Sequence, residues 1–172
     1  MSKILNDKYY SSDDIVDKCW NILNETINMD EVTEIIESSA GNGAWLEKIK
    51  ETGIDYKAYD ILPEHPEIEQ ADFLELELDY KLGRLIGFNP PFGRSNNLSR
   101  KFYNKAVGIA DYIAFIQPIS QLDNTNSMYY FDLVKSIDIG KALYSGRLLK
   151  CCFNIYKRPD VSIKAWRDKY GE

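Results

Sequence analysis

The sequence is poor in the residues that build disulfides and metal centres. It has 3 cysteines, two of them adjacent at Cys151 and Cys152, and a single histidine, His65. Cysteines in this number and spacing form no disulfide framework, and no Cys/His cluster has the spacing of a zinc site. We therefore expect a cytoplasmic protein from a reducing compartment, without a metal cofactor.

Long apolar runs are also missing. No uninterrupted apolar stretch approaches the roughly 20 residues that a membrane-spanning helix needs, so no membrane association is expected. The 172 residues are nevertheless 44% hydrophobic and 13% aromatic, which argues against disorder and allows a substantial core. No internal repeat, low-complexity tract or linker divides the chain. We expect one domain over residues 1–172.

Acidic residues are concentrated in the first half of the chain. Residues 1–80 hold 6 Lys/Arg against 20 Asp/Glu, whereas residues 81–172 hold 15 against 7. The segment 81–110 has no acidic residue and six basic ones, Lys81, Arg84, Arg94, Arg100, Lys101 and Lys105. This asymmetry indicates a polyanionic partner such as nucleic acid, with Arg94, Arg100, Lys101 and Lys105 as the candidate phosphate contacts. The alternative is a solvated helix face.

The hydrophobic pattern alternates between strand-like and helix-like segments. Helices are expected at 14–28, 45–52, 97–109 and 126–135, and strands at 32–39, 56–61, 85–89 and 111–120. Segments 136–144 and 148–157 flank Ser145-Gly146, which suggests an antiparallel hairpin. The pattern predicts an α/β fold with a mostly parallel sheet that ends in this hairpin.

A glycine-containing turn follows the first of these strands. Gly41 and Gly43 stand between the strand and the next helix, where glycine permits a positive φ and close approach of a ligand. Many tight strand-to-helix turns look alike, so this pattern alone is weak evidence. It lacks the third glycine of a dinucleotide-binding fingerprint, and it is not a phosphate loop.

Two acidic residues after the turn narrow the ligand class. Asp60 ends the second strand, 17 residues after Gly43, which is near the spacing at which a carboxylate accepts hydrogen bonds from ribose hydroxyls. Asp72-Phe73 is suited to accept from an adenine amino group and to stack on its ring. Either acid alone is typical of a turn or helix cap. In this order they favour an adenosyl ligand without a phosphate.

The segment Asn89-Pro90-Pro91-Phe92 is the strongest functional signal, and we expect these four residues to form the catalytic loop. Consecutive prolines fix φ and keep the preceding residue extended, so the loop is rigid. An exocyclic aromatic amine is a poor nucleophile because its lone pair is delocalised. Two acceptors, the Asn89 side chain and the Pro90 carbonyl, would polarise it and stabilise developing positive charge. Phe92 offers a face on which a target base could stack.

The order of five short motifs resembles that of the adenine-N6 DNA methyltransferases, in particular the short methylases of phage and restriction-modification type. The motifs are Tyr9-Tyr10-Ser11-Ser12, Glu37-Ser38-Ser39-Ala40-Gly41-Asn42-Gly43, Tyr59-Asp60-Ile61, Ala71-Asp72-Phe73 and Asn89-Pro90-Pro91-Phe92-Gly93. The resemblance covers most of the chain. It implies a seven-stranded Rossmann-like sheet, S-adenosyl-L-methionine as the cofactor and flipping of the target adenine out of the helix.

The resemblance also implies a role for each matched position. Tyr10 and Ser12 would lie near the methionine part of the cofactor. Lining that part would be four further residues, Glu37, Ala40, Gly41 and Gly43. Asp60 would bind the ribose, and Asp72 and Phe73 would hold the adenine ring. Asn89, Pro90 and Phe92 would bind the target base. No segment is long enough to be a separate target-recognition domain, so a partner subunit is one candidate source of specificity.

Several alternatives remain open at this point. RNA adenine methyltransferases and guanine-N2 methyltransferases of ribosomal RNA also use Asn-Pro-Pro-Phe, and protein glutamine methyltransferases more often have Tyr at the last position. A module with this fold that binds nucleic acid or a partner without catalysis is a further reading. The intact tetrapeptide at 89–92 argues against it.

Overall fold

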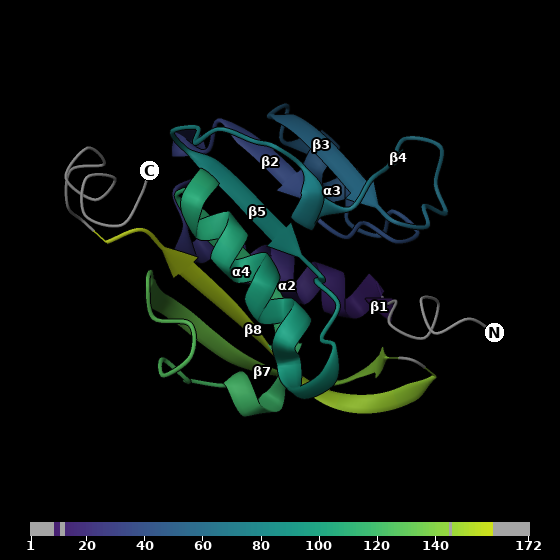
Figure 1. Cartoon of the computed structure of the whole chain (residues 1–172), viewed down its shortest axis with the longest axis vertical. Helices are drawn as coiled ribbons and strands as arrows, with labels where there is room; N and C mark the ends of the chain where they lie inside the picture. The colour runs from purple at the N-terminus through teal and green to yellow at the C-terminus, as the bar shows by residue number, and fades with distance from the viewer. Residues whose placement is uncertain (1–8, 11–12, 145, 160–172) are drawn as a thin grey trace.

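The computed structural model describes residues 9–10, 13–144 and 146–159 (Figure 1). One mixed sheet of eight strands runs through these residues, in the order β1-β7-β8-β6-β5-β2-β3-β4. In chain order the strands are β1 (Tyr9–Tyr10), β2 (Glu34–Glu37), β3 (Asp55–Asp60), β4 (Glu69–Gln70), β5 (Arg84–Phe88), β6 (Tyr112–Pro118), β7 (Asp132–Tyr144) and β8 (Arg147–Lys157). The α-helices are α2 (Asp13–Thr26), α3 (Leu46–Glu51) and α4 (Asn97–Ile109).

The sheet confirms the predicted fold class. Strands β4, β3, β2, β5 and β6 are parallel, whereas β8 is antiparallel to β6 and β7 is antiparallel to β8. The hairpin expected at 136–144 and 148–157 is therefore present and is longer than predicted. The two-residue β1 adds an edge strand beside β7 to the predicted seven.

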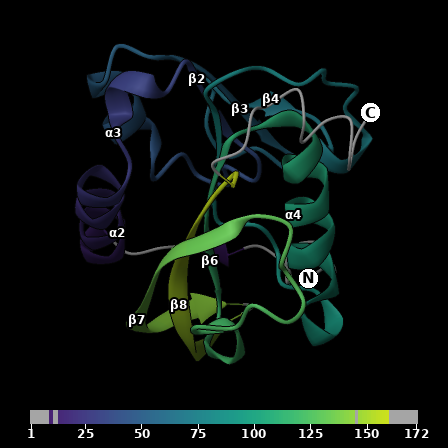
Figure 2. The ribbon, with the colours of Figure 1, turned by 90° about the vertical axis from the view of Figure 1, so that its left-hand side faces the viewer.

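Helices cover both faces of the sheet. Figure 2 shows α2 and α3 on one side and α4 on the other. Val16, Cys19 and Leu23 recur at helical spacing in α2 and are all buried. In α4 the same spacing buries Phe102 and Ala106. Helix α4 begins and ends where the sequence predicted, because its apolar stripe is regular over the whole segment.

The helix predicted at 126–135 is wrong. Residues 126–131 form no helix, and β7 begins at Asp132. Met128 and Phe131 have the spacing of a helix face, but each inserts separately from a loop into the apolar cluster around α4. The Phe131 N–H donates to the Tyr103 hydroxyl at 3.0 Å. Contacts with α4, which no local pattern encodes, decide the conformation here.

The connections place a crevice at the centre of the sheet. From β2 the chain builds β3 and β4 on one side, and it then crosses to build β5 and β6 on the other. The loops that leave β2 and β5 therefore diverge at the carboxyl edge, which is where open α/β sheets bind ligands. Both loops carry motifs singled out from the sequence. No helix in the described part of the chain is long and apolar enough to cross a membrane.

Candidate active site

A cavity of about 130 Å³ opens at this carboxyl edge. Every parallel strand from β2 to β5 contributes to its wall through the residues that follow it, and the start of α4 closes one side. The lining residues are Ser38, Ser39, Asp60, Ile61, Ala71, Asp72, Phe73, Pro91, Leu98 and Phe102. The structure thus brings together two acids, an aromatic ring and a proline that the sequence predicted for one site.

Asp60 is fixed by the glycine turn. Its side chain is 5% exposed, and its two oxygens accept backbone hydrogen bonds from Gly41 at 2.7 Å and Leu62 at 2.8 Å. Each carboxylate oxygen can accept more than one hydrogen bond, so Asp60 can hold the turn and still receive a donor from the cavity. Gly41 has φ 58°, a conformation that favours glycine and that turns its N–H toward Asp60.

Asp72 and Phe73 form the floor next to Asp60. One Asp72 oxygen accepts from the Leu74 N–H at 3.0 Å and caps the short 3₁₀ turn Phe73–Glu75. The other Asp72 oxygen has no hydrogen bond to any residue that the structure describes. The Phe73 ring is 1% exposed and stacks against Phe102 at 5.3 Å. A flat ring in the cavity could therefore meet an apolar surface and an available carboxylate oxygen together.

The glycine turn is closely packed. Ala40 is 5% exposed, and its N–H donates to the Tyr59 carbonyl at 2.8 Å. Gly43 has φ 83°, and a Cβ there would stand 3.0 Å from the His65 ring. The half-buried ring of His65 covers the turn. Glycine at 43 is thus required by both the backbone conformation and the space.

Glu37 is the most perturbed carboxyl beside this turn. It is 1% exposed at the end of the central strand β2. One oxygen accepts from the Phe88 N–H at 2.8 Å, whereas the buried Oε2 accepts no hydrogen bond from the described residues. Burial raises the pKa of Glu37 from 4.5 to about 8, against the backbone N–H groups of Phe88 and Ser39, which lower it. A cationic ligand group next to Oε2 would favour the ionised form.

The Asn-Pro-Pro-Phe loop leaves β5 on the other side of the crevice. Pro91 lines the cavity, and Asn89 is buried at 5% exposure. Phe92 is also buried, at 4% exposure, in the apolar cluster that contains Trp20 of α2. The stacking role predicted for Phe92 therefore requires its ring to leave this position. Pro90 is buried, so this loop is held firmly on the sheet.

One residue of this region was missed in the sequence. Asn96 has φ 62° at the end of the loop, next to Ser95 with φ 53°. The Asn96 side chain is 9% exposed, and neither its nitrogen nor its oxygen has a hydrogen-bond partner in the described part of the chain. Buried amides are normally paired, and strained backbone concentrates at functional sites. Nothing in the local sequence signals this burial.

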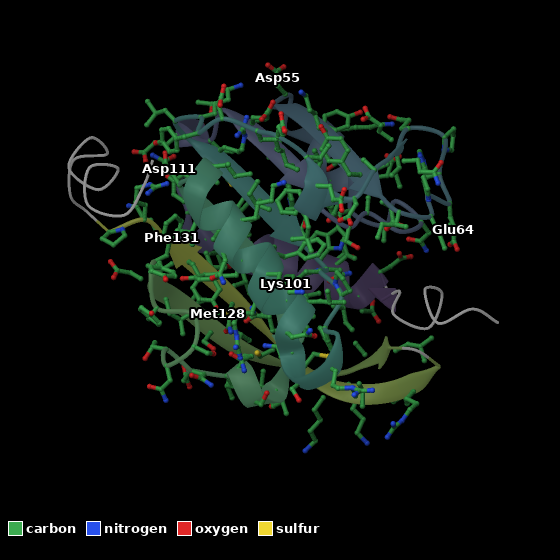
Figure 3. The ribbon with its side chains drawn as sticks, viewed as in Figure 1. Asp55, Glu64, Lys101, Asp111, Met128 and Phe131 are labelled. Atoms are coloured by element: carbon green, nitrogen blue, oxygen red, sulfur yellow. The ribbon has the colours of Figure 1, made fainter. Side chains whose placement is uncertain are left out.

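The four basic candidates do not share one environment. Arg94, Arg100 and Lys101 are exposed, and Lys101 lies on the outer side of α4 (Figure 3). Lys105 instead donates to the Leu76 carbonyl and lies 5.2 Å from the centre of the Phe73 ring. Burial lowers the pKa of Lys105 below its ordinary value. Lys105 therefore supports the cavity wall, and the other three stay accessible to a phosphate.

Two predicted residues cannot be placed in the site. Ser12 lies outside the described residues. Tyr10 belongs to β1 and pairs with Leu143 of β7, and its side chain is not among those described. Both assignments stay predictions. Among the described residues, no group of three or more His, Cys, Asp or Glu side chains could hold a metal ion.

Comparison with known proteins identifies the fold. No protein-family model and no curated protein matches the sequence. A protein described as a candidate RNA methyltransferase from Pyrococcus horikoshii superposes with a TM-score of 0.67 at 13% identity, over 88% of this chain and 86% of that one. For a candidate class I S-adenosylmethionine-dependent methyltransferase from Listeria monocytogenes the TM-score is 0.62, at 13% identity, over 92% and 63%.

A third structure of the same fold contains a cofactor product. It is the 1,6-didemethyltoxoflavin-N1-methyltransferase of Burkholderia thailandensis with bound S-adenosylhomocysteine, which superposes with a TM-score of 0.63 at 10% identity, over 87% of this chain and 80% of that one. The described chain therefore has the Rossmann-like fold that these methyltransferases share.

Proposed function

We propose that the protein is an S-adenosyl-L-methionine-dependent N-methyltransferase that acts on the 6-amino group of adenine in DNA. The observation that carries this proposal is that one cavity at the carboxyl edge is lined from both sides of the crevice. Asp60, Asp72 and Phe73 line it on one side and Pro91 of the Asn-Pro-Pro-Phe loop lines it on the other. A cofactor held by the acids and a target held by the loop would therefore meet. In this proposal the whole chain acts as one cytoplasmic domain.

The residues present fit the proposed cofactor. Asp60 has acceptor capacity for ribose hydroxyls, and the unused Asp72 oxygen can accept from the adenine amino group beside the Phe73 ring. Glu37 presents a buried oxygen that a ligand ammonium group would satisfy. When bound, S-adenosyl-L-methionine supplies a methyl group activated by a sulfonium. The acidic first half of the chain suits such a ligand, which carries no phosphate.

Asn89 and Pro90 would act on the target amine. A neutral carboxamide has no useful basicity near pH 7, so Asn89 orients and polarises the amine rather than removing its proton. The burial of Asn89 at 5% exposure strengthens this effect, because hydrogen bonds count for more away from water. The rigid proline pair fixes the second acceptor, the Pro90 carbonyl, relative to the first.

The proposed polymer substrate is nucleic acid, contacted by exposed Arg94, Arg100 and Lys101 near the loop. RNA is the second candidate, because one protein of the same fold is described as a candidate RNA methyltransferase. Target specificity would come from this surface or from a partner subunit.

The decisive experiment is methyl transfer from labelled cofactor to DNA, RNA and protein mixtures, followed by nucleoside analysis. We expect label in N6-methyladenine from DNA. Label in RNA, or in N2-methylguanine, would move the proposal to the second substrate. Calorimetry with S-adenosylmethionine and S-adenosylhomocysteine provides the control. If the wild-type protein binds neither compound at millimolar concentration, the proposed methyltransferase activity is refuted.

A further inference from the structure

The β7–β8 hairpin extends beyond β5 and β6 at the edge that carries the cavity (Figure 1). Strand β6 is parallel to β5, and its last residue Pro118 pairs with Cys151 of β8. The hairpin continues past that point for four more pairs, from Lys141 with Lys150 to Tyr144 with Arg147. We name residues 141–144 and 146–150 the hairpin tip. It therefore projects past the carboxyl ends of β5 and β6.

The two faces of the hairpin tip differ in character. Ala142 and Leu149 pack against the apolar cluster on the α2 side of the sheet. Side chains alternate between faces along a strand, so their neighbours Lys141 and Lys150 point to the opposite side, where α4 lies. Lys141, Leu143, Leu148 and Lys150 share this outer face, and all four are exposed.

The outer face combines like charges with exposed apolar side chains. Lys141 and Lys150 stand directly opposite each other, an arrangement that destabilises a hairpin. Leu143 and Leu148 form the next pair, with 45% and 66% of their surfaces exposed. A pair of lysines kept side by side at the edge of a candidate active site is explained if an anion binds between them.

No acidic side chain on the tip offsets these charges. Residues 139–159 contain five basic residues and no acidic one. The nearest acid in the hairpin, Asp138, accepts from the Gly140 N–H at 2.8 Å and closes a bulge. Asp123 lies beside Ser136, farther from the tip.

We propose that the outer face of the hairpin tip binds the phosphodiester backbone of the nucleic-acid substrate. Lys141 and Lys150 contact phosphates, and Leu143 and Leu148 contact the sugar or base edges between them. The outer face of the tip is on the same side of the sheet as Arg100 and Lys101 of α4. The inference rests on the proposed function only in taking nucleic acid as the substrate.

The test is binding of fluorescent duplex DNA, duplex RNA and single-stranded DNA by the full chain, measured as anisotropy between 0.05 and 0.2 M salt. In Lys141→Gln/Lys150→Gln, the slope of log affinity against log salt should flatten by about 0.9 per lost duplex contact, which is roughly a 10-fold loss of affinity per lysine at 0.1 M salt. The matched control is Lys18→Gln/Lys57→Gln, which removes two exposed lysines elsewhere and should keep the wild-type slope.

The apolar pair is tested separately. Leu143→Ser/Leu148→Ser should weaken binding by the same factor at every salt concentration, because no counterion is released at these positions. The lysine variant should unfold no more easily than the wild type, since it removes a like-charge pair. The nucleic acid bound most tightly identifies the substrate class.

The outcomes separate this inference from the proposed function. If nucleic-acid binding depends on Lys141 and Lys150 but no methyl transfer occurs, the proposed role of the hairpin tip is supported and the proposed methyltransferase function is refuted. Methyl transfer to nucleic acid with wild-type affinity and salt dependence in the lysine variant would refute the hairpin tip alone. Equal losses in the control variant, or no binding of any of the three probes by wild-type protein, would refute it as well.

Discussion

Replacing Glu37 by Gln should make the stability of the protein less sensitive to pH between about 5 and 8. Glu37 lies in β2 between Ala58 of β3 and Gly87 of β5, so water reaches it poorly from either side. Its pKa is raised to about 8, mainly by burial and to a smaller extent by the nearby Asp60 carboxylate. Gln is nearly isosteric. Its oxygen can accept the hydrogen bond from the Phe88 N–H, and its NH₂ occupies the place of Oε2.

The sign follows from proton binding in the two states. In the unfolded chain the carboxyl loses its proton near 4.5, whereas in the folded chain it keeps it up to about 8. The contribution of Glu37 is therefore fully present below pH 4.5 and is lost as pH rises through 8. Between these values the free energy of unfolding should fall by about 1.4 kcal/mol per pH unit. From pH 5 to 8 the free energy of unfolding of the Gln variant should rise by on the order of 4 kcal/mol relative to that of the wild type.

Urea denaturation of both proteins at pH 5, 6, 7 and 8 measures this difference. Glu47→Gln is the control, because Glu47 is exposed on α3 and its carboxyl meets water in both states. A Glu37→Gln minus wild-type difference that stays constant within about 0.5 kcal/mol across this range would refute the reasoning, since even a one-unit shift exceeds it.

The same carboxyl links stability to the proposed cofactor. An ammonium group beside Oε2 would draw Glu37 into its ionised form, so binding of S-adenosylhomocysteine at pH 7 should release a proton. Calorimetry in two buffers of different ionisation enthalpy detects that proton, and Glu37→Gln should abolish its release. Wild-type binding without proton release would show that the ligand ammonium lies elsewhere.

The remaining predictions concern single positions in the site. Asp72→Ala should weaken cofactor binding about 10-fold in calorimetry, which is the loss of one hydrogen bond to a charged acceptor; unchanged affinity would place the adenine elsewhere. Asn89→Ala should leave cofactor affinity unchanged and lower the single-turnover methylation rate by 100-fold or more, about 3 kcal/mol; a wild-type rate would make the loop structural. Asn96→Gly should raise the free energy of unfolding by about 1 kcal/mol in urea, by removing an unpaired buried amide from a left-handed backbone position, and should slow methylation. Lower stability of that variant would refute strain at Asn96.

The order of the elements could be predicted because each depends on its own sequence. Helix α4 has a regular apolar stripe, and β6 is a continuous apolar run with few competing signals. The segment 126–135 failed because Met128 and Phe131 are apolar for contacts with α4 that the local sequence does not record.

The sequence predicted which residues belong to the site, but not how deeply each side chain is buried or which residues it contacts. Arg84 counted as part of a basic segment, yet it is buried and pairs with Glu34, 50 residues away, at 2.7 Å on the adjacent strand. The side chains of Lys105 and Phe92 also point inward, because each contacts residues that are distant in the sequence. The raised pKa of Glu37 depends on two strands that close over it only in the folded sheet.

The uneven charge of the chain separates two kinds of charged group near the crevice at the carboxyl edge of the sheet. The acids that line or adjoin the cavity come from the first half of the chain. Glu37 and Asp60 end β2 and β3 and are at least nine-tenths buried, and Asp72 follows β4. The exposed basic groups proposed to contact nucleic acid come from the second half, near the start of α4 and on the hairpin tip. Buried carboxylates are screened little by salt, whereas exposed lysines and arginines are screened strongly. Cofactor affinity should therefore vary little with ionic strength while nucleic-acid affinity falls steeply, so the two binding events can be measured independently on the same protein.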